Sequence, residues 1–257
     1  MNAQTLQKKL SDLPLGRLRY FESVGSTNDE ALAWAASGAP DLSLVIADEQ
    51  TSGRGRLNRK WFTPKGTALA FSLILRSPAP ALLPRTVGLA ALSIADSLLV
   101  HQLAARIKWP NDVLVNGRKA GGVLIETVWS GTEIDSLVIG MGINVQRDSV
   151  PPAEDLQFPA TSLEEELGRA LDREEFLHDV LSAFIARRPQ LGTDAFMKDW
   201  EDLLAFRGER VQIRVNESET HTGELLGIDS RGALRLRNEH GNVVTAQVGD
   251  VSLRPAA

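Results

Sequence analysis

The hydrophobic positions divide the chain into a long region of mixed pattern and a short C-terminal region of alternating residues. Before residue 207, some segments repeat apolar residues at helical spacing, and others hold short continuous apolar runs. The clearest helical spacing covers 86–103, and the clearest apolar run is Ser-Leu-Val-Ile-Ala at 43–47. Helical spacing gathers apolar side chains on one face of a helix, whereas a short apolar run is typical of a buried strand. The long region therefore combines helices with a buried sheet.

The residues that begin and end each segment predict its elements. Ser26 or Thr27 is expected to cap a helix, with Asp29 or Glu30 in capping-box position. Asn116-Gly117 is a strong signal for a type I′ hairpin turn. The fold class expected is α+β, with a mixed or antiparallel central sheet and flanking helices. Helices are predicted over 5–13, 26–37 and 86–103, with two or three more over 162–205, and strands over 17–22, 43–47, 67–75, 106–108, 113–115, 122–128 and 135–143.

After residue 207 the chain changes to short runs of alternating apolar and polar residues, separated by turn residues. The runs are VQIRV, ETHTGELLGI, ALRLRN, VVTAQV and VSLRP. Alternation places apolar side chains on one face of a strand, and closely spaced short strands are typical of a small barrel. We therefore expect two domains, residues 1–206 and residues 207–257, the second being a small five-stranded barrel.

Composition and charge narrow the class of protein. The chain has 257 residues, a formal net charge of −5 and a sequence pI near 5.5. Such a chain does not attract DNA or RNA through its overall field, so any basic site must be local. It has no cysteine, which excludes disulfides, thiolate nucleophiles and cysteine-ligated zinc. The N-terminus lacks the apolar core of a signal peptide, and we expect the chain to contain no stretch of about 18 apolar residues that could span a bilayer. We expect a cytoplasmic protein that binds neither nucleic acid nor membranes.

The strongest local charge lies in the segment 51–65, TSGRGRLNRKWFTPK, which we call the basic loop. Gly53 and Gly55 let backbone N–H groups approach a ligand closely. A basic loop with glycines in an acidic chain indicates a site for a phosphate or a carboxylate. Taken alone, the loop is equally consistent with a solvated hairpin. It contains no acid and five cations: Arg54, Arg56, Arg59, Lys60 and Lys65.

Three further strings place polar residues at the ends of predicted strands. Pro110 interrupts the ladder between two strands, which makes the first string a rigid corner. Lys119 follows one hairpin later and is expected beside that corner. Taken alone, Trp109 is more simply a core residue, Lys119 a surface side chain and Asn144 a strand end. The coincidence of these groups at strand ends favours a site. The strings are Lys108-Trp109-Pro110-Asn111-Asp112, Arg118-Lys119-Ala120-Gly121-Gly122 and Gly140-Met141-Gly142-Ile143-Asn144.

Together these strings resemble the biotin protein ligases, the enzymes that adenylate biotin and attach it to a lysine. The resemblance covers nearly the whole chain from about Tyr20. It implies a class II synthetase-like biotin/lipoate ligase catalytic domain over 1–206 and an SH3-like β-barrel over 207–257. The matching residues run in order: S-T-N at 26–28, Q-T-S-G-R-G-R at 50–56, R-K-W at 59–61, K-W-P-N-D at 108–112, R-K-A-G-G-V-L-I-E at 118–126 and G-x-G-I-N at 140–144.

The resemblance implies an ATP-dependent reaction in two steps. Biotin and ATP form biotinyl-5′-AMP and pyrophosphate, and biotin then passes to a lysine of the biotin carboxyl carrier protein domain of a carboxylase such as acetyl-CoA carboxylase. Mg²⁺ is carried with ATP, and no residue is assigned as its ligand. A monofunctional ligase is expected, because the residues before Tyr20 are too few for an N-terminal DNA-binding domain. The oligomeric state stays open between a monomer and a homodimer paired through the central sheet.

The resemblance also implies roles for individual residues. Preorganised cations stabilise the charge that develops between a carboxylate and a phosphate, so no nucleophilic side chain is needed. Asp112 is left open among orienting Mg²⁺, Lys119 or the incoming lysine. The residues implied in catalysis are Lys119, Arg56, Arg54 and Asp112. Those implied in biotin binding are Ser26, Thr27, Asn28, Gln50, Gly53, Arg54, Gly55, Arg56, Lys119 and Gly122. Those implied in nucleotide binding are Arg56, Arg59, Trp61, Lys108, Asn111 and Asn144.

Two positions depart from the pattern of the family. Leu57-Asn58 stands where many relatives place a basic residue and a glycine, and Asn58 is expected to tolerate the left-handed conformation of that turn. Some relatives stack an aromatic residue on the adenine. This chain has Ala160 at that position, with Phe158 two residues earlier, so no stacking residue is assigned.

Two other functions fit part of the pattern. A lipoate or octanoyl transferase shares the architecture but has a different glycine-arginine signature and a longer apolar tunnel. An inactive ligand carrier whose C-terminal barrel binds nucleic acid would need a series of exposed aromatic residues, which 207–257 lacks. G-R-G-R combined with K-W-P-N-D favours biotin ligation over both.

Overall fold

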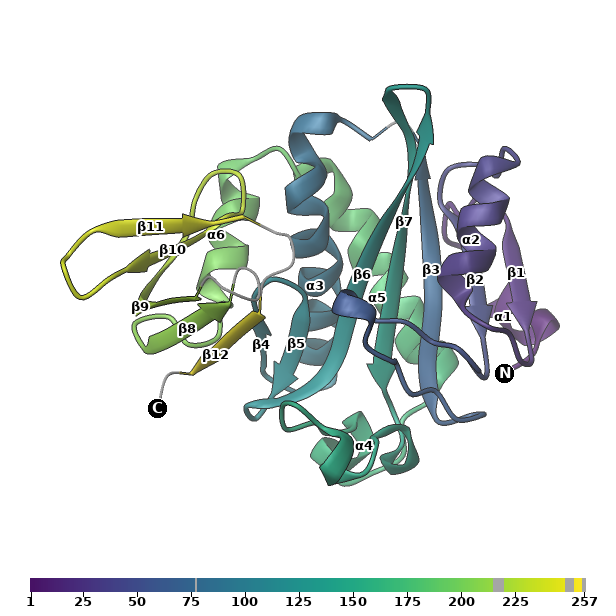
Figure 1. The fold of residues 1–257 in the computed structure, drawn as a ribbon. Helices are drawn as coiled ribbons and strands as arrows, with labels where there is room; N and C mark the ends of the chain where they lie inside the picture. The colour runs from purple at the N-terminus through teal and green to yellow at the C-terminus, as the bar shows by residue number, and fades with distance from the viewer. Residues whose placement is uncertain (77, 215–219, 248–251, 256–257) are drawn as a thin grey trace.

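A seven-stranded sheet forms the centre of the fold (Figure 1). The computed structural model describes residues 1–76, 78–214, 220–247 and 252–255. The strands of this sheet are β1 (Leu18–Phe21), β2 (Ser43–Ala47), β3 (Ala68–Arg76), β4 (Ala105–Lys108), β5 (Asp112–Val115), β6 (Arg118–Ser130) and β7 (Glu133–Asn144). Their order is β1-β2-β3-β7-β6-β5-β4, with β1 parallel to β2 and the other neighbours antiparallel. The α+β class and the mixed sheet predicted from the sequence are confirmed.

Helices cover both faces of this sheet (Figure 1). One face carries α2 (Thr27–Ala36), whose Trp34 packs in a small core with Val45 of β2. The other face carries α3 (Leu83–Val100) and α5 (Arg173–Arg187), which join Leu44 and Ile46 of the same strand in the main core. Alternate residues of β2 therefore belong to different cores, as its continuous apolar run predicts. The other helices described are α1 (Ala3–Lys9), α4 (Leu163–Leu167) and α6 (Asp194–Asp202), with short 3₁₀ turns η1 (Arg56–Asn58), η2 (Pro80–Leu82), η3 (Arg147–Ser149), η4 (Ala153–Asp155) and η5 (Arg188–Gln190).

Two local predictions have different outcomes. Asn116 and Gly117 both have positive φ, 48° and 74°, as a type I′ turn between β5 and β6 requires. Helix α2 begins after the N-cap Ser26, as predicted, but the Ser26 side chain makes no capping hydrogen bond. The predicted capping box was wrong for Asp29, which pairs with Arg54 of the basic loop instead. A tertiary ion pair has replaced the expected local hydrogen bond.

The apolar character of α3 corrects another expectation. The segment Pro80–Val100 is long and apolar enough to cross a membrane by length and composition, with a mean hydropathy of 1.4. The prediction that no such stretch exists was therefore wrong. In the structure 67% of this apolar stretch is buried, and α3 packs against α5 and strands β4 to β6. A helix that is apolar nearly all round is also what the centre of a large core requires.

A second sheet of five short antiparallel strands follows α6. The five strands predicted after residue 207 are confirmed, and we propose the domain boundary at 206/207. Val215, Glu219, Val248 and Val251, which the predicted runs include, lie outside the described residues. The strands are β8 (Arg210–Arg214), β9 (Thr220–Ile228), β10 (Leu234–Arg237), β11 (Val243–Ala246) and β12 (Ser252–Pro255), in the order β11-β10-β9-β8-β12.

The corner at 108–112 links the two sheets through Trp109. This side chain is fully buried, and its Nε1 donates a hydrogen bond of 3.0 Å to the carbonyl of Gly232 in the C-terminal unit. Just before the corner, Ile107 accepts a 2.9 Å hydrogen bond from the backbone N–H of Ala205. Trp109 therefore has the structural role that its residue type suggested.

Replacing Trp109 by Phe should lower the free energy of unfolding by about 1–3 kcal/mol, because the buried Gly232 carbonyl loses its donor. Urea unfolding followed by circular dichroism measures this change. Trp129→Phe is the matched control, since Trp129 is 59% exposed and its replacement should matter by less than about 0.5 kcal/mol. Equal stability of the two variants would show that the indole bond does not hold the two sheets together.

Candidate active site

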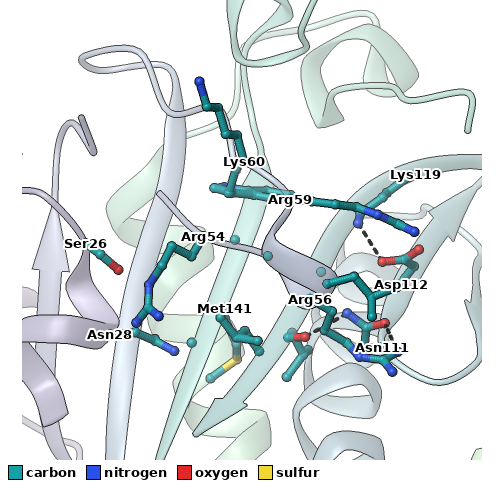
Figure 2. A pocket seen from close by; sticks show the side chains of 18 of the residues that line it. Ser26, Asn28, Arg54, Arg56, Arg59, Lys60, Asn111, Asp112, Lys119 and Met141 are labelled. Carbon is teal, nitrogen blue, oxygen red and sulfur yellow. Dashed lines mark hydrogen bonds and ion pairs between the residues drawn. The ribbon is translucent and has the colours of Figure 1, made fainter. Parts of the chain in front are cut away.

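The structure brings the predicted site residues together around three adjoining cavities at the ends of the central strands (Figure 2). We call the cavity that is lined by Asn144 the second cavity. The third cavity lies beneath the basic loop and is lined by Gly53. The first cavity lies between the N-terminus of α2, the basic loop, the corner and strands β6 and β7. Of the predicted residues it is lined by Ser26, Thr27, Asn28, Gln50, Arg54, Gly55, Arg56, Arg59, Trp61, Lys108, Asn111, Asp112, Lys119 and Gly122.

One end of the first cavity is a buried network of hydroxyls and amides. The backbone N–H and the hydroxyl of Thr27 donate to Gln50 Oε1 at 2.8 and 3.1 Å. The Ser72 hydroxyl donates to Asn28 Oδ1 at 2.6 Å. Groups that both donate and accept can bind a neutral polar ring. We did not predict a site role for Ser72 from the sequence, although a single serine within the apolar run of β3 indicates a buried polar contact.

Two glycines of β7 make room for the side chains that line this cavity. A Cβ at Gly140 would lie 2.2 Å from Asn28 Oδ1, and one at Gly142 would lie 2.3 Å from the Trp61 ring. Neither contact is possible, so both positions must stay glycine while Asn28 and Trp61 lie on the sheet. The alternating glycines of Gly140-Met141-Gly142 are explained by this close approach.

Asp112 is the electrostatic centre of the site. Its Oδ2 accepts a 2.8 Å hydrogen bond from Lys108, and its Oδ1 lies 2.6 Å from Lys119 Nζ. Burial alone would raise the pKa of Asp112, but the charges and hydrogen bonds of Lys119 and Lys108 outweigh burial and hold that pKa well below its usual value. The three groups therefore carry one net positive charge. Because both carboxylate oxygens face lysines, the geometry favours the orientation of Lys119 among the three roles left open for Asp112.

Lys119 lies where the first cavity meets the second. Both cavities are lined by Lys119, Asp112 and Trp61, and Lys119 Nζ is 5.3 Å from the centre of the Trp61 ring. The backbone of Lys119 is fixed on both sides, since its N–H donates to Pro159 at 2.8 Å and its carbonyl accepts from Thr161 at 2.9 Å. An ammonium group is thus held between two spaces, where it can contact a ligand in each.

The arginines of the basic loop point in different directions (Figure 2). Arg56 donates to Asn111 Oδ1 at 3.2 Å, and Arg59 extends toward Asp112 and Lys119. Arg54 lies near Asn28 and pairs with acidic side chains instead. Two of the three arginines therefore lie on the Lys119 side of the cavity, and the roles of all three stay predictions.

The basic loop is a short hairpin. Arg54 and Lys60 form an antiparallel bridge, and the Trp61 N–H donates to the Gly53 carbonyl at 2.9 Å. At its tip Leu57 takes the left-handed conformation, with φ 58° and ψ 38°, which the sequence analysis expected of Asn58. That conformation costs a residue with a side chain about 1–2 kcal/mol.

The second cavity combines aromatic and amide groups. The buried indole Nε1–H of Trp61 has no hydrogen-bond partner among the described residues, which leaves it available to a ligand. Phe158 lines the same space, with its ring 4.9 Å from Lys108 Nζ. Asn144 donates to the Thr161 carbonyl at 3.0 Å and is nearly buried. Phe158 was left unassigned from the sequence, and its place here identifies it as an aromatic surface of the cavity.

Comparisons with known proteins agree with this geometry. The model of the Biotin/lipoate A/B protein ligase family matches residues 20–144, and that of the Biotin protein ligase C terminal domain matches residues 206–254. The Biotin--[acetyl-CoA-carboxylase] ligase of Paracoccus denitrificans is 39% identical over 229 residues, covering 85% of this chain and 93% of the relative. The chain belongs to the biotin protein ligase family.

Two other members of the biotin protein ligase family are similar over most of the chain. The Bifunctional ligase/repressor BirA of Bacillus spizizenii is 34% identical over 229 residues, covering 87% of this chain and 70% of that protein. The biotin protein ligase from Aquifex aeolicus, solved in complex with biotin and ATP, has a TM-score of 0.78 and 30% identity, covering 93% of this chain and 99% of that chain. All of the site residues predicted from the sequence lie within the matched segment 20–144.

Gly53→Ala should open the basic loop, and Gly55→Ala should not. A Cβ at Gly53 would lie 2.4 Å from the Trp61 carbonyl, whereas one at Gly55 would lie 3.6 Å from its nearest neighbour, the Arg59 carbonyl. Overpacking costs about 1–3 kcal/mol, so hydrogen exchange of the Trp61 amide should become about tenfold faster in Gly53→Ala. Exchange by Gly55→Ala should match that of the unmodified chain. Equal protection in both variants would contradict the packing that we describe for the loop.

Proposed function

We propose that this chain is an ATP-dependent biotin–protein ligase that biotinylates the carrier domain of a biotin-dependent carboxylase. The observation that carries this proposal is the position of Lys119, which Asp112 holds at the junction of the two cavities. The buried polar network suits the neutral ring of biotin, and the aromatic and amide groups of the second cavity suit a nucleotide. A carboxylate from one side and a phosphate from the other would then meet at Lys119.

In the first step an oxygen of the biotin carboxylate attacks the α-phosphorus of ATP. The bond from that phosphorus to the bridging oxygen breaks, and pyrophosphate leaves biotinyl-5′-AMP behind. Two anions must approach each other, so the cations Lys119, Arg56 and Arg59 supply the stabilisation that the step requires. The carboxylate is already ionised at neutral pH, so no side chain has to remove a proton.

In the second step the amine of an acceptor lysine attacks the carbonyl carbon of the mixed anhydride. The bond from that carbon to the phosphate oxygen breaks, AMP leaves, and the amine loses one proton as the amide forms. The intermediate would hydrolyse if water reached it, and the hairpin of the basic loop lies beside the first cavity where it can exclude water.

The contacts support individual assignments as part of this proposal. Ser26, Thr27, Asn28 and Gln50 would bind the biotin ring. Trp61, Lys108, Asn111 and Asn144 would bind the nucleotide, and Phe158 would offer its ring to the adenine. Mg²⁺ would arrive on the phosphates, because both oxygens of Asp112 face lysines and the described residues form no cluster of three His, Asp or Glu that could hold a metal ion.

The proposal also includes the setting in which the enzyme acts. We place it in the cytoplasm, with no nucleic-acid partner. It would be a monomer or a homodimer paired through the central sheet, whose edge strands are β1 and β4.

Mass spectrometry of a biotin carboxyl carrier domain tests the function. Incubation with the enzyme, ATP, Mg²⁺ and biotin should add one biotinyl group to the carrier, and a carrier whose acceptor lysine is replaced by Arg should stay unmodified. Lipoate in place of biotin should give no product. A mass increase with lipoate alone would favour the lipoate ligase alternative, and none with biotin would overturn the proposal.

Lys119→Ala should lower biotin-dependent exchange of pyrophosphate with ATP by about a hundredfold or more, since the cation between the two anions is lost. Arg118→Ala is the matched control. Arg118 is the adjacent cation, but it pairs with Glu165 and Glu166 at 2.6 and 2.7 Å, away from the cavities. Exchange by this control should stay near the unmodified rate. Similar activity in both variants would remove Lys119 from the mechanism.

A further inference from the structure

Arg54 stands apart from the other cations of the basic loop. Its Nη2 lies 3.1 Å from Glu126 Oε2 and also pairs with Asp29. The two acids come from different elements, Glu126 from β6 and Asp29 from the first turn of α2. One arginine of the loop is therefore joined to both the sheet and the helix beneath it.

Glu126 is also part of the buried polar network. Its Oε2 accepts a 2.7 Å hydrogen bond from Asn28 Nδ2, and Asn28 in turn accepts one from Ser72. Asn28 is 4% exposed and the Glu126 side chain 24% exposed. An unbroken chain of contacts thus runs from β3, through Asn28 and Glu126, to Arg54 in the loop.

The pair of Arg54 and Glu126 is partly shielded from solvent, with side chains that are 41% and 24% exposed. If the loop opened, the Glu126 carboxylate would lose its cationic partner and retain only the neutral Asn28 as a hydrogen-bond partner, which is unfavourable in a partly buried position. Another ion pair of the same loop, Lys65 with Glu22 at 3.5 Å, has side chains that are 61% and 77% exposed. Exposed pairs of that kind contribute little.

We propose that Glu126 is a positioning residue that anchors the basic loop over the first cavity through Arg54. Two carboxylates compensate the charge of Arg54, so it holds the loop in place while Arg56, Arg59 and Lys119 face the anions. The inference rests on the proposed function for its consequence, which is retention of the adenylate beneath the loop. The anchoring itself is a property of the chain without substrate.

Limited trypsin digestion tests the anchor, with cleavage followed after Arg56, Arg59 and Lys60, three loop sites that every variant below keeps. Glu126→Gln keeps an oxygen that can accept from Asn28 but removes the charge that binds Arg54. Cleavage within the loop should become about 5- to 10-fold faster in this variant, as a larger fraction of molecules is open. Glu22→Gln makes the same chemical change at the exposed pair and should leave the cleavage rate unchanged.

Arg54→Gln gives a second route to the same state, on the loop side of the pair, where the core is untouched. Arg54→Gln should be cleaved at least as fast as Glu126→Gln, because it also removes the pair with Asp29, and the double variant should match Arg54→Gln, because the Glu126 change then removes no further pair with Arg54. Each should also release more free biotinyl-adenylate in the absence of the carrier domain. Unchanged cleavage in both single variants would overturn the anchor. The anchor would also be overturned if the two substitutions increased the cleavage rate additively and only Arg54→Gln lowered pyrophosphate exchange. Arg54 would then act on the substrate anions instead.

The outcome is separable from that of the proposed function, since digestion requires neither biotin nor ATP. Faster cleavage of the variants in a chain that fails to biotinylate the carrier would leave the anchor standing and overturn the function alone.

Discussion

The buried carboxylate of Asp112 contacts the ammonium groups of two lysines, and the arrangement of the site depends on these two contacts. Burial by itself disfavours each of these charges. This buried carboxylate contacts Lys108 and Lys119, whose charges hold its pKa low, and it fixes Lys119 between two cavities. The sheet register makes the contact possible, because Asp112 lies opposite Lys108 on one side and Gly122 on the other. A Cβ at Gly122 would lie 3.2 Å from Lys119 Nζ, so the glycine leaves the space that the ammonium group occupies. The cluster keeps one net positive charge, which anions from the two cavities can share.

The basic loop divides its charges between two tasks. Arg56, held by Asn111, and Arg59 face the lysine cluster, whereas Arg54 binds the acids of α2 and β6. A loop that only carried positive charge would be repelled by Lys108 and Lys119, because like charges at close range oppose each other. Pairing one arginine with two carboxylates offsets part of that repulsion and brings the remaining cations over the cavity. In the anchor that we propose, the acidic partners Asp29 and Glu126 hold this loop in place.

Much of the fold follows from local patterns, and the rest depends on contacts between distant residues. The apolar run of β2, the Asn116-Gly117 turn and the five C-terminal strands follow from alternation and turn residues within a few positions. The site residues came from motifs, and the structure brings them together because those motifs lie at strand ends. The sequence assigns no role to Ser72, Glu126 or Phe158, because their contacts depend on the residues that the fold places opposite them. Asp29 likewise pairs with the distant Arg54 instead of capping its own helix. The composition of α3 alone does not distinguish a helix buried in a protein core from one that crosses a membrane.

A crystal structure with biotin and a non-hydrolysable ATP analogue would test the central claim most directly, namely that Lys119 receives both anions. The account predicts that the biotin carboxylate and the α-phosphate both lie within about 3.2 Å of Lys119 Nζ, with the biotin ring on the network of Thr27, Asn28 and Gln50. The claim would be contradicted if either the carboxylate or the α-phosphate were bound out of reach of Lys119 and Asp112 contacted neither lysine.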